Sequence, residues 1–282
     1  MSETTLESAL RAAATELQQA GIEGAETDAR RLMAHVLGLD AAGLILRLKE
    51  PLTPDLLADF DKVLKERLER KPVSHITGQR EFWNRSFAVG PPVLDPRPET
   101  ETLVEKALEQ PFRRVLDLGT GSGCILLTLL AERDGTTGMG VDISPEALDY
   151  AVRNRAALGL EKRAIFAQSD WFERVVGKFD LVVANPPYIS IGEMPTLAPE
   201  VLRWEPMHAL TPGPTGLEAY QLIAAGLAPF LEDGARILLE IGPTQGDDVA
   251  AIFTAAGFEL VAIHDDMDGR NRVVEVKFPV VE

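Results

Sequence analysis

The most restrictive stretch of this 282-residue chain is an apolar run, Leu181 to Ala184, that leads directly into Asn185-Pro186-Pro187-Tyr188. The run shows no alternation of polar and apolar residues, so it predicts a strand that is covered on both faces, as in a parallel sheet. The two prolines lack an N–H and fix their own φ, so neither helix nor sheet can continue through them. The sequence therefore predicts a stiff turn at the carboxyl end of a buried strand.

This turn carries groups that could bind a ligand. The Asn185 amide oxygen and the Pro186 carbonyl are hydrogen-bond acceptors, Pro187 stiffens the backbone, and Tyr188 offers an aromatic face. Together they favour a slot for a flat group that donates hydrogen bonds, such as an amide or an exocyclic amine. A rigid loop that merely ends a strand is the alternative.

Composition narrows the classes of partner. The formal net charge of −16 argues against a partner held mainly through nucleic-acid phosphates, since such binding needs clustered Lys and Arg. The single cysteine, Cys124, permits no intrachain disulfide, and no apolar run is long enough for a membrane span. The first residues do not resemble a secretory signal. We therefore expect a cytoplasmic protein with neither stable nucleic-acid binding nor a membrane partner, and no motif indicates a metal site.

The chain divides by pattern into three parts. Residues 1–72 show amphipathic helical periodicity over 3–20, 26–38 and 54–70, with Thr53-Pro54 as a helix start, and predict a small helical bundle for packing or substrate recruitment. Residues 73–98, rich in aromatic residues, Gly and Pro, predict a β-hairpin linker. Residues 99–282 form the third part, the predicted catalytic domain.

A rigid segment, Pro96-Arg97-Pro98-Glu99, precedes the helix expected after Thr100. Thr100 is a good candidate to cap that helix through its hydroxyl. Local sequence favours reading the segment as punctuation between two parts of the chain. A strap across an active site is the alternative.

Strands and helices alternate from Arg113 onward, which predicts a parallel sheet with helices on both faces. The first strand leads into Gly119-Thr120-Gly121-Ser122-Gly123, and a glycine-rich turn at this place lets a ligand approach the backbone closely. The spacing differs from the dinucleotide fingerprint, and the carboxylate of Asp117 before the loop would repel a pyrophosphate. An acid here suits a cationic ligand such as S-adenosylmethionine.

Polar residues also follow the next strands. Asp142 ends the second strand, at the distance expected for an acid that holds ribose hydroxyls, although a capping carboxylate is the alternative. Asp170 and Trp171 follow the third strand and could hold the edge and cover the face of an adenine, although Trp171 could equally be a core residue. The long connection 189–216 predicts a lid or docking loop. The pattern over 258–278 predicts a closing antiparallel hairpin.

These motifs together resemble the HemK family of glutamine-amide methyltransferases, which act on peptide chain release factors. The resemblance extends over nearly the whole chain, and the stretches that carry it are Pro96 to Glu101, Asp117 to Gly123, Asp142, Ser169 to Trp171, Asn185 to Tyr188, Glu205-Pro206, Leu239 to Gly242 and Gly269 to Arg272. Asn-Pro-Pro-Tyr alone also occurs in adenine amino-methyltransferases of DNA, so that motif indicates the shape of the acceptor and not its identity. The Pro-Arg-Pro-Glu-Thr segment and the helical N-terminal part are more specific.

The resemblance implies a Rossmann-like, S-adenosylmethionine-dependent α/β fold and methylation of the glutamine in a Gly-Gly-Gln motif of release factors. It implies that Gly119 to Gly123 surround the methionine part of the donor, that Asp142 holds the ribose and that Trp171 packs near the adenine. Asn185, also a donor-site residue, and the Pro186 carbonyl would accept the amide hydrogens, with Tyr188 against the amide plane. A glutamine of a ribosomal protein, an adenine of nucleic acid and a non-catalytic nucleotide-binding role stay open as alternatives.

Overall fold

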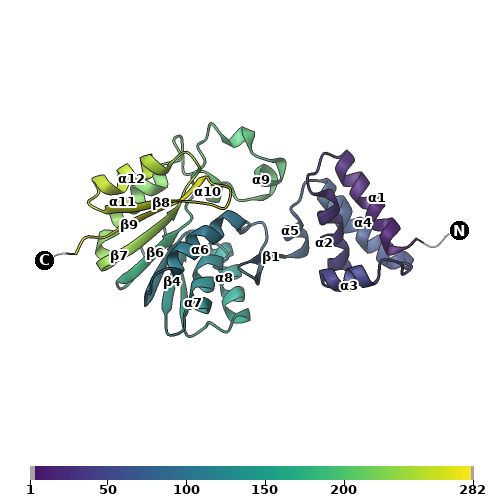
Figure 1. The fold of residues 1–282 in the computed structure, drawn as a ribbon, viewed down its shortest axis with the longest axis horizontal. Coiled ribbons are helices and arrows are strands. Elements are labelled where there is room, and N and C mark those ends of the chain that lie inside the picture. The colour runs from purple at the N-terminus through teal and green to yellow at the C-terminus, as the bar shows by residue number, and fades with distance from the viewer. Residues whose placement is uncertain (1–3, 281–282) are drawn as a thin grey trace. The chain divides into compact units, whose positions relative to one another are not determined.

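The computed structural model of this chain describes residues 4–280, and its chain forms two compact units. The first unit takes the chain up to Gly78 and, in addition, the distant segment Ala198–Trp204. The second unit takes Gln79–Leu197 and everything from Glu205 onward. Figure 1 shows the elements of both units along the chain.

The first unit is helical. Its helices are α1 (Leu6–Gln19), α2 (Ala25–Leu37), α3 (Ala41–Leu46), α4 (Pro54–Leu68), α5 (Val73–Thr77) and α9 (Pro199–Trp204). The expected start of α4 is confirmed, because the Thr53 hydroxyl accepts a hydrogen bond from the backbone N–H of Leu56 at 3.3 Å. Leu17, Leu32 and Met33 are fully buried where the apolar stripes meet. Helix α5 occupies the first residues of the stretch expected as a hairpin linker.

Helix α9 is attached to the first unit by ion pairs. The Glu200 carboxylate lies 3.0 Å from Nη1 of Arg67 and 3.2 Å from Nη1 of Arg70. Arg67 is buried, and its Nε donates to Asp28 at 2.8 Å. The Lys71 ammonium lies 5.6 Å from the centre of the Trp204 ring. A segment from the middle of the sequence is thereby built into the N-terminal unit.

The second unit is organised around a seven-stranded sheet. Its order is β5-β4-β3-β6-β7-β9-β8, and β9 runs antiparallel to both of its neighbours while the other pairs are parallel. The strands are β3 (Arg114–Leu118), β4 (Thr137–Asp142), β5 (Ala164–Gln168), β6 (Phe179–Ala184), β7 (Leu231–Glu240), β8 (Glu259–Asp265) and β9 (Asn271–Lys277). The expected parallel sheet and its closing antiparallel hairpin are both confirmed.

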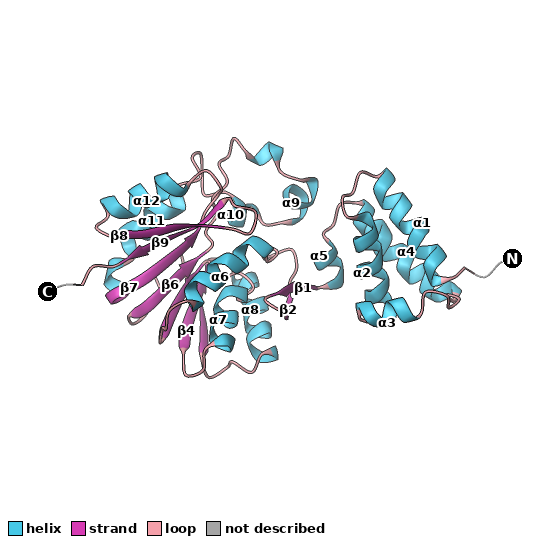
Figure 2. Ribbon diagram, in the orientation of Figure 1, coloured by secondary structure: helices cyan, strands magenta, loops and turns pink. Residues whose placement is uncertain are grey.

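Helices cover both faces of this sheet (Figure 2). Strand residues alternate between two apolar clusters, so that Val182 faces the cluster of α11 and α12 whereas Val183 faces the cluster of α6 and α7. The helices and helical turns of this unit are η1 (Pro98–Thr100), α6 (Glu101–Leu108), α7 (Cys124–Glu132), α8 (Pro145–Ala157), η2 (Met194–Thr196), α10 (Met207–Leu210), α11 (Glu218–Gly226), η3 (Ala228–Phe230) and α12 (Gly246–Ala255). Because helices bury both faces of the sheet, its strands carry unbroken runs of apolar residues.

A short hairpin begins the second unit. Strands β1 (Gln79–Phe82) and β2 (Arg85–Ala88) pair antiparallel, and the two turn residues Trp83 and Asn84 have φ of 50° and 54°, as a tight hairpin turn requires. The Asn154 side chain bonds both the N–H and the C=O of Ala88, at 2.7 and 3.1 Å. The hairpin is thus fixed to α8.

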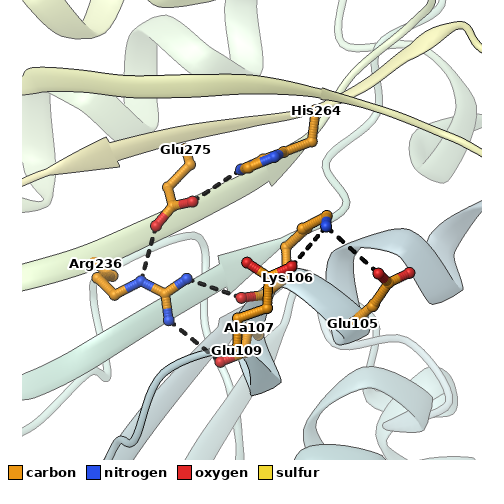
Figure 3. A network of polar contacts seen from close by, with 7 residues as sticks. All are labelled: Glu105, Lys106, Ala107, Glu109, Arg236, His264 and Glu275. Carbon is orange, nitrogen blue, oxygen red and sulfur yellow. Dashed lines mark hydrogen bonds and ion pairs between the residues drawn. The ribbon is translucent and has the colours of Figure 1, made fainter.

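A buried arginine holds the end of α6 against the sheet (Figure 3). Arg236 of β7 donates to the backbone carbonyls of Ala107 and Lys106, at 3.2 and 2.8 Å, and its Nε donates to Glu275 at 2.8 Å. The second Glu275 oxygen lies 2.8 Å from Nε2 of His264. The guanidinium therefore satisfies carbonyls that a helix leaves without partners at its C-terminus.

Candidate active site

A cavity of about 300 Å³ lies in the second unit at the carboxyl ends of the parallel strands. Strands β3 and β6 pair so that Leu118 lies beside Ala184, and the loops that follow both strands therefore open at the same edge of the sheet. The wall is formed by Pro92–Arg97, Thr100, Gly119–Ser122, Cys124, Ile125, Val141–Ile143, Ala147, Ser169–Trp171, Asn185, Pro187, His208, Ala209, Thr211, Pro212, Glu218, Ala219 and Leu222.

The glycine-rich loop forms one side of the cavity. The φ values of Gly119 and Gly121 are 70° and 55°, and no atom lies within 4 Å of the position where either would carry a Cβ. This backbone is both left-handed and open to a ligand. Gly123 is instead the N-cap of α7, and a Cβ at this position would lie 3.1 Å from the side chains of Leu127 and Phe166. It is not among the residues that line the cavity.

Asp142 connects the glycine loop to the loop after β4. One carboxylate oxygen accepts from the N–H of Gly121 at 2.8 Å, and the other accepts from the N–H of Ser144 at 2.9 Å. Burial raises the pKa of Asp142, and these two backbone donors oppose that shift. Asp142 lines the cavity, which agrees with a ligand-binding role, and it also bonds the backbone of two loops, which agrees with a capping role. Its bond to ribose stays a prediction.

Asp117 lies behind the glycine loop and is absent from the cavity wall. Its Oδ2 accepts from the Thr120 hydroxyl at 2.6 Å, and burial raises the pKa of the carboxyl to about 7. Its second oxygen has no partner within residues 4–280. The expectation that this charge faces a cationic ligand directly is therefore not supported, and Asp117 holds the loop from behind.

Trp171 lines the cavity from a strained backbone. Its φ is 45°, which is rare for a bulky residue. The Ser169 hydroxyl stabilises this turn, since it donates to the Trp171 carbonyl at 3.0 Å and accepts from the N–H of Arg174 at 2.9 Å. The ring also packs against the core cluster beside α11. Trp171 is thus a wall residue and a core-contacting residue together, and its contact with adenine stays a prediction.

Asn185 presents an unused acceptor. Its Nδ2 donates to the Thr100 hydroxyl at 3.3 Å, whereas its buried Oδ1 has no hydrogen-bond partner in the described part of the chain. An unpaired buried amide oxygen is costly and marks a place where a ligand donor would bind. Asn185 lines the cavity, and the role of this oxygen as the acceptor for a substrate N–H stays a prediction.

The remaining residues of the Asn-Pro-Pro-Tyr turn have different positions. Pro187 lines the cavity, whereas Pro186 and Tyr188 are not among its lining residues. Tyr188 packs against the core cluster, its carbonyl accepts from the Gln245 side chain at 2.9 Å, and burial raises the pKa of its phenol. The roles assigned to the Pro186 carbonyl and the Tyr188 ring stay predictions.

The segment Pro96-Arg97-Pro98-Glu99, which local sequence favoured as punctuation, contributes Pro96 and Arg97 to the cavity wall. Nη2 of Arg97 lies 2.5 and 2.7 Å from the two carboxylate oxygens of Glu205. Arg80 supports the same segment, with its Nε donating to the Pro96 carbonyl at 3.0 Å. This position agrees with the strap interpretation, and a role of the segment in catalysis stays a prediction. The rigid Pro-Arg-Pro sequence was its only local signal.

Thr100 corrects another expectation. It stands at the start of α6, but its side chain makes no capping hydrogen bond there. Its hydroxyl accepts a hydrogen bond from Asn185 Nδ2 instead, at 3.3 Å. Thr100 therefore stands in a sequence that is typical of a helix cap, but its hydroxyl is used in a contact with a distant residue.

The long connection 189–216 is not one open loop, because short helical elements interrupt it. It contains η2, α9 and α10. Its last part reaches the cavity through His208, Ala209, Thr211 and Pro212, none of which sequence reasoning assigned to a site. A lid motion of this segment stays a prediction.

Residues 4–280 contain no group of His, Cys, Asp and Glu side chains arranged to hold a metal ion. None of the helices in the same range is long and apolar enough to cross a membrane.

Comparison with known proteins agrees with this geometry. Residues 8–78 match the family model described as the PrmC N-terminal domain, and residues 95–213 match the methyltransferase small domain. The chain is 51% identical over 271 residues to a release factor glutamine methyltransferase of Cereibacter sphaeroides, covering 96% of this chain and 98% of that one. It is 45% identical over 259 residues to the protein of the same name in Rhodospirillum rubrum, covering 91% of this chain and 80% of that one.

Among solved structures, the hMettl16 catalytic domain in complex with an RNA hairpin superimposes with a TM-score of 0.58. The match is 17% identical and covers 76% of this chain and 82% of that chain, so it supports the methyltransferase fold alone. The sequence relatives carry the assignment further, because they span both units and nearly the full length of each protein. This chain belongs to the release factor glutamine methyltransferase family.

Proposed function

We propose that this chain transfers the methyl group of S-adenosylmethionine to the side-chain amide nitrogen of the glutamine in the Gly-Gly-Gln motif of peptide chain release factors. The name of the full-length relatives supports the substrate class. The observation that carries the chemistry is the Asn185 amide: the residue lines the cavity, and its buried Oδ1 has no hydrogen-bond partner among the described residues. An acceptor of this kind recognises an NH₂ group and not a carboxylate.

The cavity has features that suit the donor. Gly119 and Gly121 leave the backbone open for the amino-acid part, and Asp142 lies where it could accept from ribose hydroxyls. Trp171 also lines the cavity, and its flat apolar ring suits packing against the adenine. When bound, the donor supplies a methyl group activated by the adjacent sulfonium charge.

The protein accelerates methyl transfer mainly by orienting the substrate amide against the donor. An amide nitrogen is a poor nucleophile because its lone pair is delocalised into the carbonyl. Acceptors that hold the NH₂ group with nitrogen toward the methyl convert an encounter into an aligned displacement, and such alignment is worth roughly 7–11 kcal/mol in favourable cases. The N–C bond forms as the S–C bond breaks, and the sulfonium becomes a neutral thioether.

Positive charge develops on the nitrogen during this displacement. Asn185 Oδ1 then accepts a stronger hydrogen bond than it does from the neutral amide, so the interaction favours the transition state over the ground state. The extra proton leaves the nitrogen after methyl transfer. No base is required before the displacement.

Transfer of a labelled methyl group to purified release factor tests the proposal directly. The matched control is the same factor with its Gly-Gly-Gln glutamine changed to alanine. Label on the first factor and none on the second is the expected result. Label on neither, with the donor still bound, would contradict the proposal and direct the search to ribosomal proteins.

A further inference from the structure

One side chain outside the cavity, Gln245, connects three segments at the carboxyl edge of the sheet. It is the N-cap residue of α12, and its Nε2 donates to the Tyr188 carbonyl at 2.9 Å. The same nitrogen reaches the Gly216 carbonyl at 3.4 Å, and Oε1 accepts from the N–H of Gly242 at 2.9 Å. These partners belong to the Asn-Pro-Pro-Tyr turn, to the turn before α11 and to the residues just after β7.

The junction suits an amide better than a carboxylate or an alkyl chain. A glutamine side chain carries two N–H donors on one atom and an acceptor on the other, which matches two carbonyls and one N–H. The packing is close, since a Cβ at Gly216 would lie 2.4 Å from the Tyr188 carbonyl oxygen. A Cβ at Gly242 would lie 2.9 Å from Oε1 of Gln245. Neither glycine has room for a side chain, so the segments meet at the Gln245 amide itself.

The Asn-Pro-Pro-Tyr turn depends on contacts at its two ends. Its prolines have no N–H, so they donate no backbone hydrogen bond. At the start of the turn, Nδ2 of Asn185 donates to Thr100 at 3.3 Å, and at its end the Tyr188 carbonyl accepts from Gln245 at 2.9 Å. Because the prolines fix their own φ, a displacement of Tyr188 is passed on to Asn185.

Gln245 acts on the cavity from outside, since it is not among the lining residues. The turn that it holds contributes Asn185 and Pro187 to the wall, and α11 contributes Glu218 and Ala219. The 2.9 Å bond to the turn is shorter than the 3.4 Å contact before α11, so the turn depends on Gln245 more than α11 does.

We propose that Gln245 is a positioning residue that holds the Asn-Pro-Pro-Tyr turn where Asn185 meets the amide of the acceptor glutamine. This inference rests on the proposed function, since it concerns the same acceptor. A misplacement of about 1 Å by a change away from the reacting atoms can cost roughly 10²-fold in rate. Loss of the Gln245 amide should therefore slow methyl transfer. The glycine loop and Asp142 take no part in the three contacts, so the donor should still bind.

The test compares Gln245→Met and Gln245→Glu with Gln221→Met at pH 8. Methionine keeps the length of the side chain without its hydrogen bonds, and an ionised glutamate keeps the acceptor for Gly242 but loses both donors. Gln221 is exposed on α11 and does not line the cavity, so it controls for the substitution itself. We expect kcat for release factor, counted per donor-binding site, to fall about tenfold or more in both Gln245 variants. It should stay unchanged in Gln221→Met.

Donor affinity provides the readout that a merely structural role would not give. Calorimetry should show a change of less than about twofold in either Gln245 variant. A residue needed only for packing would instead reduce the number of donor-binding sites and leave kcat per site intact. A wild-type kcat in either Gln245 variant would overturn the inference, and so would a loss of donor affinity as large as the loss of kcat.

A measurement without turnover separates this inference from the proposed function. In protein labelled with ¹⁵N-asparagine, the side-chain NH₂ signals of Asn185 are those that vanish in Asn185→Ala. They should shift in Gln245→Met and stay in place in Gln221→Met, because only the first change releases the turn. If they shift in this way but the wild type methylates no release factor, the substrate proposal fails and the positioning role stands. Unshifted Asn185 signals in Gln245→Met would refute the positioning role itself.

Discussion

Removal of the Arg236 guanidinium should destabilise the second unit more than any exposed arginine can. The Arg236→Ala change leaves Glu275, whose side chain is 4% exposed, with the imidazole of His264 as its remaining side-chain partner among residues 4–280. It also removes the donors for the Lys106 and Ala107 carbonyls at the end of α6. Losing one partner of a buried ion pair typically costs about 3–5 kcal/mol.

The assay is urea and thermal unfolding of the full chain. For a domain of this size each kcal/mol shifts Tm by roughly 2–4 °C, so the loss of about 3–5 kcal/mol predicts a fall of roughly 6–20 °C for the transition of the second unit. Arg113→Ala is the matched control, because Arg113 pairs with Glu232 at 2.7 Å but its side chain is 78% exposed. An exposed pair is worth about 0–1 kcal/mol.

A double variant, Arg236→Met with Glu275→Leu, separates charge from packing. It removes both buried charges at once, and replacement of a buried pair by apolar residues is often neutral or stabilising. We expect it to be clearly more stable than Arg236→Ala. If Arg236→Ala lost no more stability than Arg113→Ala, the account of α6 as a helix held at its C-terminus by a buried charge would be wrong.

Three further predictions concern the site. Asn185→Ala should lower kcat by about 10²–10³-fold with donor affinity largely unchanged, and near-normal turnover would refute its role as acceptor. Asp142→Ala should weaken donor binding, measured by calorimetry, because the glycine loop loses the anchor at Gly121 and the ribose its partner; unchanged affinity would count against both. Burial raises the pKa of Glu240 from 4.5 to about 7, so its contribution to stability is complete below about pH 4.5 and is lost as pH rises through 7. Glu240→Gln should make denaturation midpoints less dependent on pH in that range, and an identical pH dependence in both proteins would contradict the raised pKa.

The sheet was predictable because burial on both faces leaves a strong trace in sequence. The strand before Asn185, the glycine turn after β3 and the acid after β4 were all expected at strand ends, and the parallel pairing brings those ends to one edge. The order of the strands follows from packing, and no single local pattern contains it.

The rest of the site depends on contacts between distant residues. Arg97 reaches its place through Glu205, 108 positions later in the chain. Thr100 has the sequence of a helix cap, but its hydroxyl serves Asn185 instead. His208 and Thr211 come from a connection whose path no periodicity describes. Such residues have no local signal, because their roles arise only when separate segments meet.

The insertion of α9 into the N-terminal unit limits how this protein can be cut or recombined. The chain passes between its two units after Gly78, after Leu197 and after Trp204, so one cleavage cannot release an intact N-terminal unit. A fragment that ends at residue 78 would leave Arg67 and Arg70 without Glu200. Exchange of the first unit between relatives would have to carry residues 198–204 as well, so the two segments should be inherited together despite their distance in the gene.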